Sequence, residues 1–287
     1  MISPEPRVTV EPSPTPDPAG GRWDSHRLDL AGYLARIGYG GDLEPTARTL
    51  TALHRAHVLA IPFDNLEIWL GRPILLDLDD VQDKLVRRRH GGYCYEHTLL
   101  FAAVLDRLGF EVTGLGSRVR MGGDQLRAIT HALVKVTVDG EDWLADVGFG
   151  SAGLLEPIPL RDGARATQGG WTFGLTEEAG GVYALRSLRA AGWFDLHAFT
   201  TERRYPPDYA VMNHYTSTHP RSPFTGRLVV ARTFDDRRLS LVDGQLTTTR
   251  ADGVEEVEVV DAPQLPTALR EVFGYDLDAA DADALSR

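Results

Sequence analysis

One residue in the sequence has the chemistry of a covalent catalyst. Cys94 is the only cysteine among the 287 residues, and it stands in the segment HGGYCYEHT. Two glycines before it predict a sharp turn, and the apolar residues after it predict a helix that begins at the cysteine. A thiol attacks as a thiolate, which a helix N-terminus and a neighbouring imidazolium both favour. The position therefore indicates a nucleophile, and the alternative is an inert buried thiol that packs like a small apolar side chain.

The sequence predicts a β-hairpin around Asp139-Gly140, a dipeptide that favours two-residue turns. Apolar residues alternate along the two expected strands, THALVKVTV and DWLADVGFG. With these two residues as the turn, Val134 faces Ala145, and one face of the hairpin is wholly apolar. A three-residue loop would spoil this match, so we expect the two-residue turn.

This register places His131 and Asp146 on the other face of the hairpin, as diagonal neighbours roughly 7–8 Å apart between backbones. Two polar side chains can bridge that distance. With Cys94 they would form a thiol acyl-transfer site, in which the imidazole ionises the thiol and the carboxylate fixes the tautomer of the imidazole. Two alternatives stay open. His97, one helical turn after the cysteine, is a rival base, and Asp146 could serve only as a turn or capping residue beside Gly148.

The elements that must position these residues change along the chain. Residues 1–22 contain six prolines and predict an extended or disordered leader. Residues 23–108 predict a helical domain that carries the nucleophile, because apolar residues recur three and four apart. Its helices are expected in HRLDLAGYLARIGY, EPTARTLTALHRAHVLA, DLDDVQDKLVRRR and YEHTLLFAAVLDRLGF. Residues 109–211 have period two and predict a β domain that carries the histidine and the aspartate. Residues 212–287 predict a third domain of strands followed by a helix.

Composition limits the class of protein. Hydrophobic residues make up 43% of the chain and charged residues 25%, as in globular proteins, and no apolar run is long enough to span a membrane. The formal net charge of −11 argues against a nucleic-acid partner, so a phosphate-bearing ligand must be held locally. A single cysteine cannot form an internal disulfide, and the N-terminus lacks the pattern of a signal peptide. We therefore expect a cytoplasmic protein that binds neither nucleic acid nor membrane.

Five motifs, in one order, resemble the arylamine N-acetyltransferase family. They are LAIPFDNLEI, GGYCYEH, THALVKV, LADVGFG and NHYTSTHPRSPF, and the resemblance extends from about Leu28 to Phe273. It implies an α+β fold with an N-terminal helical bundle, a central β-barrel-like domain and a C-terminal α/β lid, with the triad arranged as in cysteine proteases. It also implies that Cys94, His131 and Asp146 are the catalytic residues, and these include the pair that the hairpin register brings together.

The resemblance also implies binding residues. The acyl-acceptor pocket would contain Phe63, Phe149, His214 and Tyr215, and coenzyme A would lie against the backbone of Gly148, Gly150 and Ser151. Each of these residues has an ordinary alternative role in the core, in the lid or in a bend of the chain. The family often has a second glycine where Ser151 stands.

The sequence departs from the family pattern beside the nucleophile. The family usually has arginine directly before the glycine pair and asparagine at the position of Thr98, whereas here His90 precedes the glycines. The family's arginine commonly pairs with a carboxylate at the position of Asp64. We therefore expect a contact between His90 and Asp64 as a replacement.

The expected activity is transfer of an acetyl group from acetyl-coenzyme A, the co-substrate, through a cysteine thioester to an arylamine or arylhydrazine, without a metal. The alternative within the same fold is a macrolactam-forming amide synthase, which would take its acyl group from a polyketide thioester on a carrier protein. A hydrolase or peptidase with the same triad, and a ligand-binding module with an inactive site, are alternatives of other classes. Acylation by free acetyl-coenzyme A separates the acetyltransferase from the amide synthase, and amine-dependent turnover separates it from the hydrolase.

Overall fold

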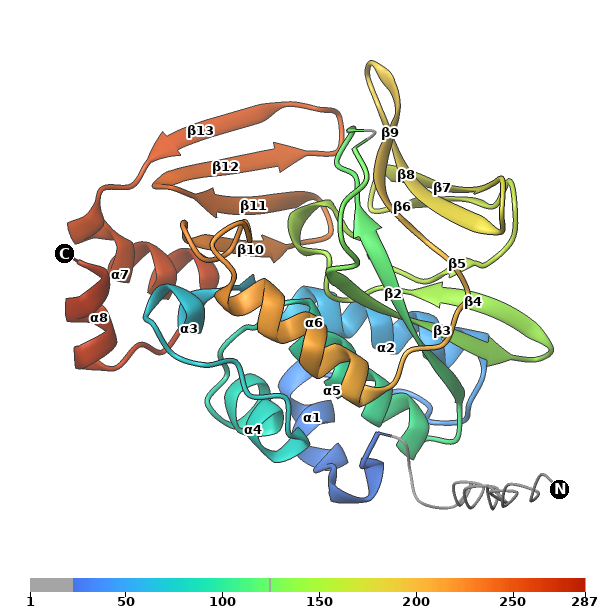
Figure 1. Ribbon diagram of the computed structural model, residues 1–287. Helices are drawn as coiled ribbons and strands as arrows, with labels where there is room; N and C mark the ends of the chain where they lie inside the picture. Colours follow the sequence, from blue (N-terminus) through green and yellow to red (C-terminus); the bar gives the residue numbers. More distant parts are fainter. Residues whose placement is uncertain (1–22, 124, 287) are drawn as a thin grey trace, which may run out of the picture.

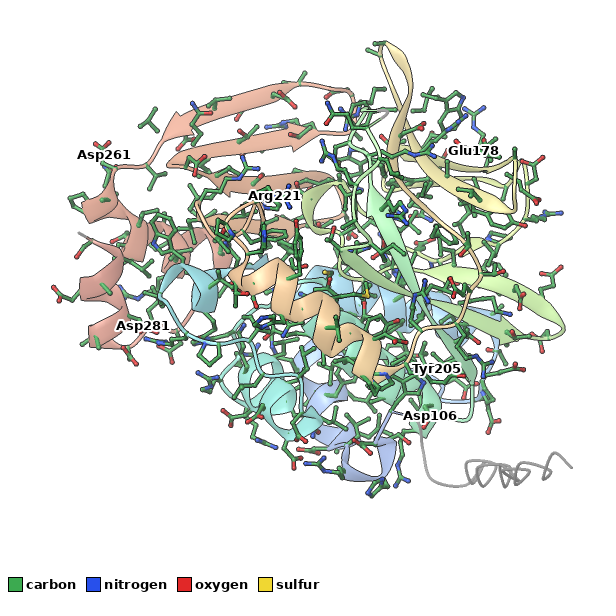
Figure 2. All side chains as sticks on the ribbon, in the orientation of Figure 1. Asp106, Glu178, Tyr205, Arg221, Asp261 and Asp281 are labelled. Carbon is green, nitrogen blue, oxygen red and sulfur yellow. The ribbon has the colours of Figure 1, made fainter. Side chains whose placement is uncertain are left out.

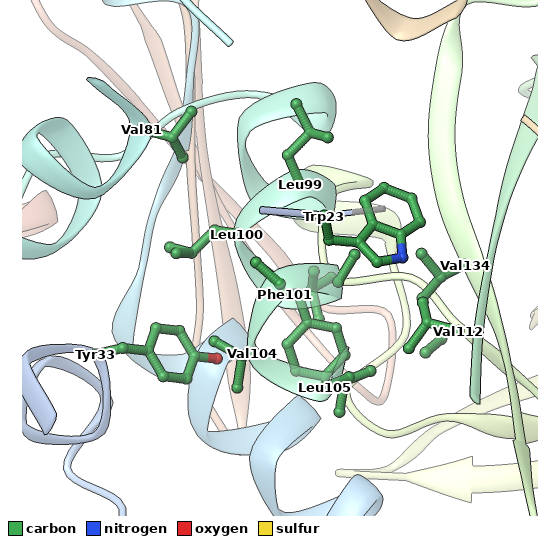
Figure 3. Close-up of a cluster of buried hydrophobic side chains, with 14 of the residues drawn as sticks. Trp23, Tyr33, Val81, Leu99, Leu100, Phe101, Val104, Leu105, Val112 and Val134 are labelled. Atoms are coloured by element: carbon green, nitrogen blue, oxygen red, sulfur yellow. The ribbon is translucent and has the colours of Figure 1, made fainter. Parts of the chain in front are cut away.

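Helix α5 (Cys94–Arg107) is the central element of the fold and carries the expected nucleophile at its first position. The structure is a computed structural model, and it describes residues 23–123 and 125–286. All residues of α5 except the last two are buried, so it needs apolar neighbours around its whole circumference. Figure 3 shows apolar side chains from several segments packed around it. Gly109 follows the helix with a φ of 88°, a left-handed conformation that glycine commonly adopts after a helix.

The helices predicted before α5 are all present. They are α1 (Leu30–Ile37), α2 (Ala47–Ala60) and α4 (Leu78–Gln82), with a short helix α3 (Leu66–Trp69) before α4 and a π-helical turn η2 (Asp83–Arg87) after it. The side chains of Asp29 and Thr46 cap α1 and α2 by accepting backbone N–H groups of their first turns. Figure 1 shows these helices grouped around α5. They supply one side of the core that holds the nucleophile in place.

Eight antiparallel strands form a near-closed barrel on the other side of α5, and the predicted α+β class is confirmed. The strands are β2 (Glu111–Val119), β3 (His131–Val138), β4 (Glu141–Ala145), β5 (Ile158–Pro159), β6 (Arg165–Gln168), β7 (Trp171–Glu178), β8 (Val182–Arg189) and β9 (Gly192–Phe199). Their order in the sheet is β5-β4-β3-β2-β9-β8-β7-β6. The strand that begins at His131 therefore lies inside the sheet, with a neighbour on each side.

The β3–β4 hairpin has the predicted register. Val134 faces Ala145, and the turn residues Asp139 and Gly140 have φ values of 54° and 77°, as a two-residue turn with two positive φ angles requires. The ladder between the two strands ends at the pair of Val134 and Ala145. Asp146 therefore lies directly beyond the strand, where its backbone is free to bond elsewhere.

A second antiparallel sheet forms the C-terminal part of the fold. Its strands, in sheet order, are β1 (Phe63–Asp64), β10 (Val229–Thr233), β11 (Arg237–Val242), β12 (Gln245–Arg250) and β13 (Glu255–Val259). In Figure 1 the helices α7 (Leu265–Ala268) and α8 (Ala279–Leu285) lie beside one end of this sheet. β1 pairs with β10, and its Phe63 also forms an isolated parallel bridge with Gly92, so this sheet is joined to the turn before the nucleophile.

Helix α6 (Pro206–Thr218) is an element that the sequence pattern did not indicate. In Figure 1 it crosses the front of the molecule. It runs across the border that we expected between residues 211 and 212, and the division into domains stays a prediction. The expected leader, residues 1–22, lies outside the described residues. In the part of the chain that the structure describes, no helix combines the length and apolar character needed to cross a bilayer.

Candidate active site

A cavity of about 830 Å³ contains both the expected nucleophile and the expected base. Cys94 and His131 line this cavity, and each is only 3% exposed. The rest of its wall comes from the end of β2 and the connection between β2 and β3, the turn after β4, the end of α6 with the loop after it, and the five-stranded sheet. Its volume is in the range of sites for small molecules and cofactors. The sequence alone did not place α5 against β3, and the structure brings the two together here.

Close packing around the turn before Cys94 explains the glycine pair. A Cβ on Gly91 would overlap the carbonyl oxygen of Pro62, and a Cβ on Gly92 would lie 2.8 Å from Oε2 of Glu96. The same carboxylate oxygen accepts the backbone N–H of the residue before Cys94 at 3.0 Å. Only glycine fits at these two positions, and the Glu96 side chain fixes the start of the helix.

Two further contacts hold α5 against the hairpin. The hydroxyl of Thr98 donates a hydrogen bond of 2.9 Å to the carbonyl of Ala132, the residue after His131. A Cβ on Gly148 would lie 2.8 Å from Cα of Cys94, so a glycine is needed for the turn after β4 to approach the nucleophile. Thr98, although it differs from the residue usual in the family, therefore links the helix directly to the strand.

His131 and Asp146 form a buried hydrogen-bonded pair. Nε2 of His131 lies 2.8 Å from Oδ2 of Asp146, and Oδ1 accepts the N–H of Gly148 at 3.2 Å. Burial disfavours the charged imidazole, but Asp146, with a further contribution from Cys94, raises the pKa of His131 to about 10. Burial also opposes ionisation of Asp146, yet His131 and His197 hold its pKa well below the usual range. Near neutral pH the pair is therefore an imidazolium and a carboxylate, and Nδ1 is the nitrogen left for the thiol.

Two histidines that the sequence pattern did not indicate surround Asp146. Nε2 of His197 lies 3.1 Å from Oδ2, and the backbone N–H of Asp146 donates to Nε2 of His54 at 3.1 Å. Burial lowers the pKa of both histidines, so both are neutral. The ligand atoms of His131, Asp146 and His197 lie within 4.8 Å of one another, close enough for a metal, although the His131 contact has the length of a charge-assisted hydrogen bond. The one signal for His197 was a polar residue inside the apolar segment FDLHAF.

The rival base, His97, forms its hydrogen bonds with His57 and Pro62 and with no carboxylate. Its Nδ1 lies 2.8 Å from Nε2 of His57, and its Nε2 donates to the carbonyl of Pro62 at 3.1 Å. Nδ1 of His57 in turn accepts the hydroxyl of Tyr33 at 2.9 Å. Because burial lowers the pKa of His97 to about 4, this chain of hydrogen bonds joins neutral groups. We therefore assign His97 a structural role.

We expect the protein to lose stability when the pH falls below about 6.5. Burial holds the folded-state pKa values of His54 and His97 at about 4, whereas both titrate near 6.5 in the unfolded chain. Below that pH the unfolded state binds more protons, and each histidine lowers the free energy of unfolding by roughly 1 kcal/mol between pH 6.5 and pH 5.5. Urea unfolding should show a combined loss of at least about 2 kcal/mol, and His97→Gln should reduce this loss by about 1 kcal/mol. A free energy of unfolding that does not change over this interval would contradict the buried neutral state.

The expected contact between His90 and Asp64 is wrong. Asp64 is fully buried, and it accepts the hydroxyl of Tyr275 and the N–H of Leu66, the latter at 2.9 Å. His90 lies beside the ring of Tyr275, and its Nε2 is 3.2 Å from the carbonyl oxygen of Asp276. A tyrosine 211 positions away in the chain thus satisfies the carboxylate, since burial requires a hydrogen-bond partner and the hydroxyl provides one without adding a charge.

Most residues implied for binding line the cavity. Those on its wall are Phe63, Phe149, Tyr215, Gly148, Gly150 and Ser151. The ring of Phe149 packs against that of His131, with centroids 4.9 Å apart, so an aromatic surface lies next to the expected base. His214 is exposed on α6 and is not part of the described wall. Phe224, which we did not predict, adds a further ring from the loop after α6.

Comparisons with known proteins identify what the chain is similar to. Residues 46–282 match the N-acetyltransferase family. The arylamine N-acetyltransferase of Mycolicibacterium smegmatis is 40% identical over 91% of this chain and 97% of its own length. The solved structure of the Nocardia farcinica arylamine N-acetyltransferase has a TM-score of 0.90 and 45% identity, covering 95% of this chain and 98% of its own. The Mycobacterium marinum arylamine N-acetyltransferase in complex with CoA has a TM-score of 0.84 and 34% identity, covering 90% and 98%.

Proposed function

Because the chain belongs to the arylamine N-acetyltransferase family, we propose that it transfers an acetyl group from acetyl-coenzyme A to an arylamine or arylhydrazine through Cys94. The observation that carries this proposal is the buried hydrogen bond between His131 and Asp146 beside the thiol, in one cavity. This arrangement places a nucleophilic thiol beside an imidazolium that can transfer a proton, the two groups that acyl transfer through a thioester requires.

In the first half-reaction the Cys94 thiolate attacks the carbonyl carbon of the acetyl thioester. The bond from that carbon to the sulfur of coenzyme A breaks, and the imidazolium of His131 gives its proton to the departing thiolate. The backbone N–H of Cys94 belongs to the first turn of α5, where such groups have no partner within the helix. It is the natural donor to the oxyanion of the tetrahedral intermediate. One thioester replaces another, so the free energy changes little.

In the second half-reaction the amine nitrogen attacks the acetyl group on Cys94. Arylamines are weak bases and arrive unprotonated, so His131, now neutral, needs to take only the proton that becomes acidic as the new C–N bond forms. The bond to the Cys94 sulfur then breaks, and the thiolate and the imidazolium are restored. Asp146 keeps Nε2 of His131 as the donor throughout, so that Nδ1 always faces the thiol.

Intact-protein mass spectrometry after mixing with acetyl-coenzyme A tests the proposal. We expect one added acetyl group on Cys94, which disappears when an arylamine is added and persists in buffer without one. If the adduct were lost in buffer as fast as in the presence of the arylamine, the protein would be a hydrolase. The absence of any adduct with free acetyl-coenzyme A would contradict the acetyl donor and favour the amide synthase, whose polyketide thioester is bound to a carrier protein.

A further inference from the structure

Arg238 is a buried cation with which no carboxylate in the described part of the chain pairs. It lies on β11, is only 5% exposed, and its Nε has no hydrogen-bond partner among the described atoms. Arg120, by contrast, binds Glu178 at the end of β7 with two hydrogen bonds of 2.6 Å, and Figure 2 labels this carboxylate. Burial of a charge without an opposite charge is costly, and an apolar side chain could pack there at a lower cost. This cost indicates a role beyond packing.

The guanidinium group of Arg238 binds the turn after β4, which forms part of the wall of the active-site cavity. Nη1 donates to the carbonyl of Ser151 at 2.8 Å, and Nη2 donates to the carbonyl of Gly153 at 2.9 Å. These two residues belong to the short helix η3 (Gly150–Ala152) and to the position after it. Ser240, two residues after Arg238 on β11, lines the cavity, and residues two apart on a strand share a face. Arg238 therefore approaches the turn from the cavity side of the five-stranded sheet.

Aromatic rings of the barrel fix the guanidinium group from another side. Its central carbon lies 4.2 Å from the ring centroid of Trp171 and 5.5 Å from that of Phe173, both on β7. Burial lowers the pKa of Arg238 to about 9, so the group keeps its charge near neutral pH. A planar guanidinium can stack on a ring and donate to two carbonyls at the same time, which an ammonium group cannot. The turn is thus held in one position between the two sheets.

The position of this turn determines where the ring of Phe149 lies. A Cβ on Gly153 would be 3.0 Å from Cβ of Phe149, so the backbone that Arg238 binds packs directly against this phenylalanine. The ring of Phe149 packs in turn against that of His131, with centroids 4.9 Å apart. An arylamine must bring its nitrogen to the acetyl group on Cys94 beside this base, so its aromatic ring lies next to Phe149.

We infer that Arg238 is a positioning residue for the second half-reaction. By binding the carbonyls of Ser151 and Gly153, it keeps Phe149 where the ring of the arylamine packs during attack on the acetyl group. This inference rests on the proposed acetyltransferase function. Arg238 itself touches neither substrate nor the reacting atoms, and it acts through the turn alone. Its effect should therefore depend on the ring of the acceptor and not on the chemistry of the thioester.

The test compares an acceptor that has an aromatic ring with one that has none. Acetyl-Cys94 would be formed with 4-nitrophenyl acetate, and its loss to aniline and to hydroxylamine would be followed by intact-protein mass spectrometry. In Arg238→Lys and Arg238→Met, the ratio of the second-order rate constants for aniline and hydroxylamine should fall roughly tenfold. The reason is that a hydrogen bond to a charged group contributes about this factor to the equilibrium that holds the turn.

Arg232→Lys and Arg232→Met are the matched controls and should keep the parent ratio. Arg232 lies on β10 of the same sheet, donates to the carbonyl of Val272 at 3.3 Å and stacks on the ring of Phe234. It therefore makes the same kinds of contact as Arg238, but it lies outside the described wall of the cavity.

Gly153→Ala tests the same contact while Arg238 stays in place. The added methyl group must displace Phe149, because the two Cβ atoms would be only 3.0 Å apart. This variant should also lower the ratio for aniline and hydroxylamine. In all these variants the pH profile for alkylation of Cys94 by iodoacetamide should coincide with that of the parent, since neither Arg238 nor Gly153 bonds to the catalytic residues.

An unchanged ratio in the folded Arg238 variants would overturn the inference, as would an equal decrease with both acceptors, because a general structural defect has that effect. An alkylation profile that shifts in Arg238→Met but not in Arg238→Lys would overturn it too, since the charge would then act on the thiol. If circular dichroism shows that the Arg238 variants do not fold, an unchanged ratio in Gly153→Ala would overturn it. A parent protein that 4-nitrophenyl acetate acetylates and acetyl-coenzyme A does not would instead overturn the proposed donor, and the ratio would still test the role of Arg238.

Discussion

Cys94→Ser is expected to abolish acetyl transfer, with a loss of at least about 10⁴-fold in kcat/KM. In the parent protein His131 is an imidazolium near neutral pH, because its pKa is raised to about 10. A serine hydroxyl ionises only far above neutral pH, and an imidazole that is already protonated cannot act as its base. The variant would therefore have neither an ionised nucleophile nor a group that can ionise it. Steady-state kinetics and the intact mass after incubation with acetyl-coenzyme A would measure this loss.

The control for this prediction is a test that the variants keep the fold of the parent protein. Cys94 is 3% exposed and borders the cavity, so the exchange of a sulfur for an oxygen removes little packing. Circular dichroism and urea unfolding of Cys94→Ser and Cys94→Ala should show that both variants fold as the parent does. Substantial turnover by the folded Cys94→Ala variant would show that another residue forms the acetylated intermediate. The assignment of Cys94 as the nucleophile would then be wrong.

The parts of the site that could be predicted from the sequence are those with local signals. The pairing of His131 with Asp146 follows from the alternation of two short strands and from the turn residues between them, and the observed register agrees with it. The start of α5 at Cys94 follows from the glycine pair before it. Each of these signals lies within a short stretch of chain, where period and turn chemistry determine the conformation.

The parts that could not be predicted depend on contacts between distant segments. The hydroxyl of Tyr275 reaches Asp64 across 211 positions, and nothing in either segment indicates the other. His197 comes to Asp146 only because β9 lies next to β2 when the barrel closes. The strand pattern of β2 itself is weakened by Gly114, which the structure needs because a Cβ there would lie 2.6 Å from the hydroxyl oxygen of a buried tyrosine of α6. Such requirements arise from packing and leave no periodic trace in the sequence.

Asp146→Asn is expected to inactivate the enzyme by a different route, by a factor on the order of 10⁴ in kcat. Burial opposes the charge on His131, and the carboxylate is the main group that outweighs it. With an amide in its place, the pKa of His131 should fall below its ordinary value, so the ring becomes neutral near pH 7. The amide can also present its N–H to Nε2 and hold the wrong tautomer. Asp142→Asn is the matched control, because that carboxylate lies on the same hairpin and pairs with Lys135 outside the cavity wall.

Loss of activity in Asp146→Asn would not by itself separate catalysis from structure, because the same carboxylate accepts the N–H of Gly148. The rate of alkylation of Cys94 by iodoacetamide, measured against pH, makes this distinction. In the parent and in Asp142→Asn the imidazolium should keep the thiol ionised, so that alkylation stays fast well below pH 8. In Asp146→Asn the profile should approach that of a free thiol, with a rate at pH 6.5 roughly 100-fold lower. If the variant is folded by circular dichroism and keeps the parent profile, the carboxylate does not act through His131, and the triad inferred from the hairpin is wrong.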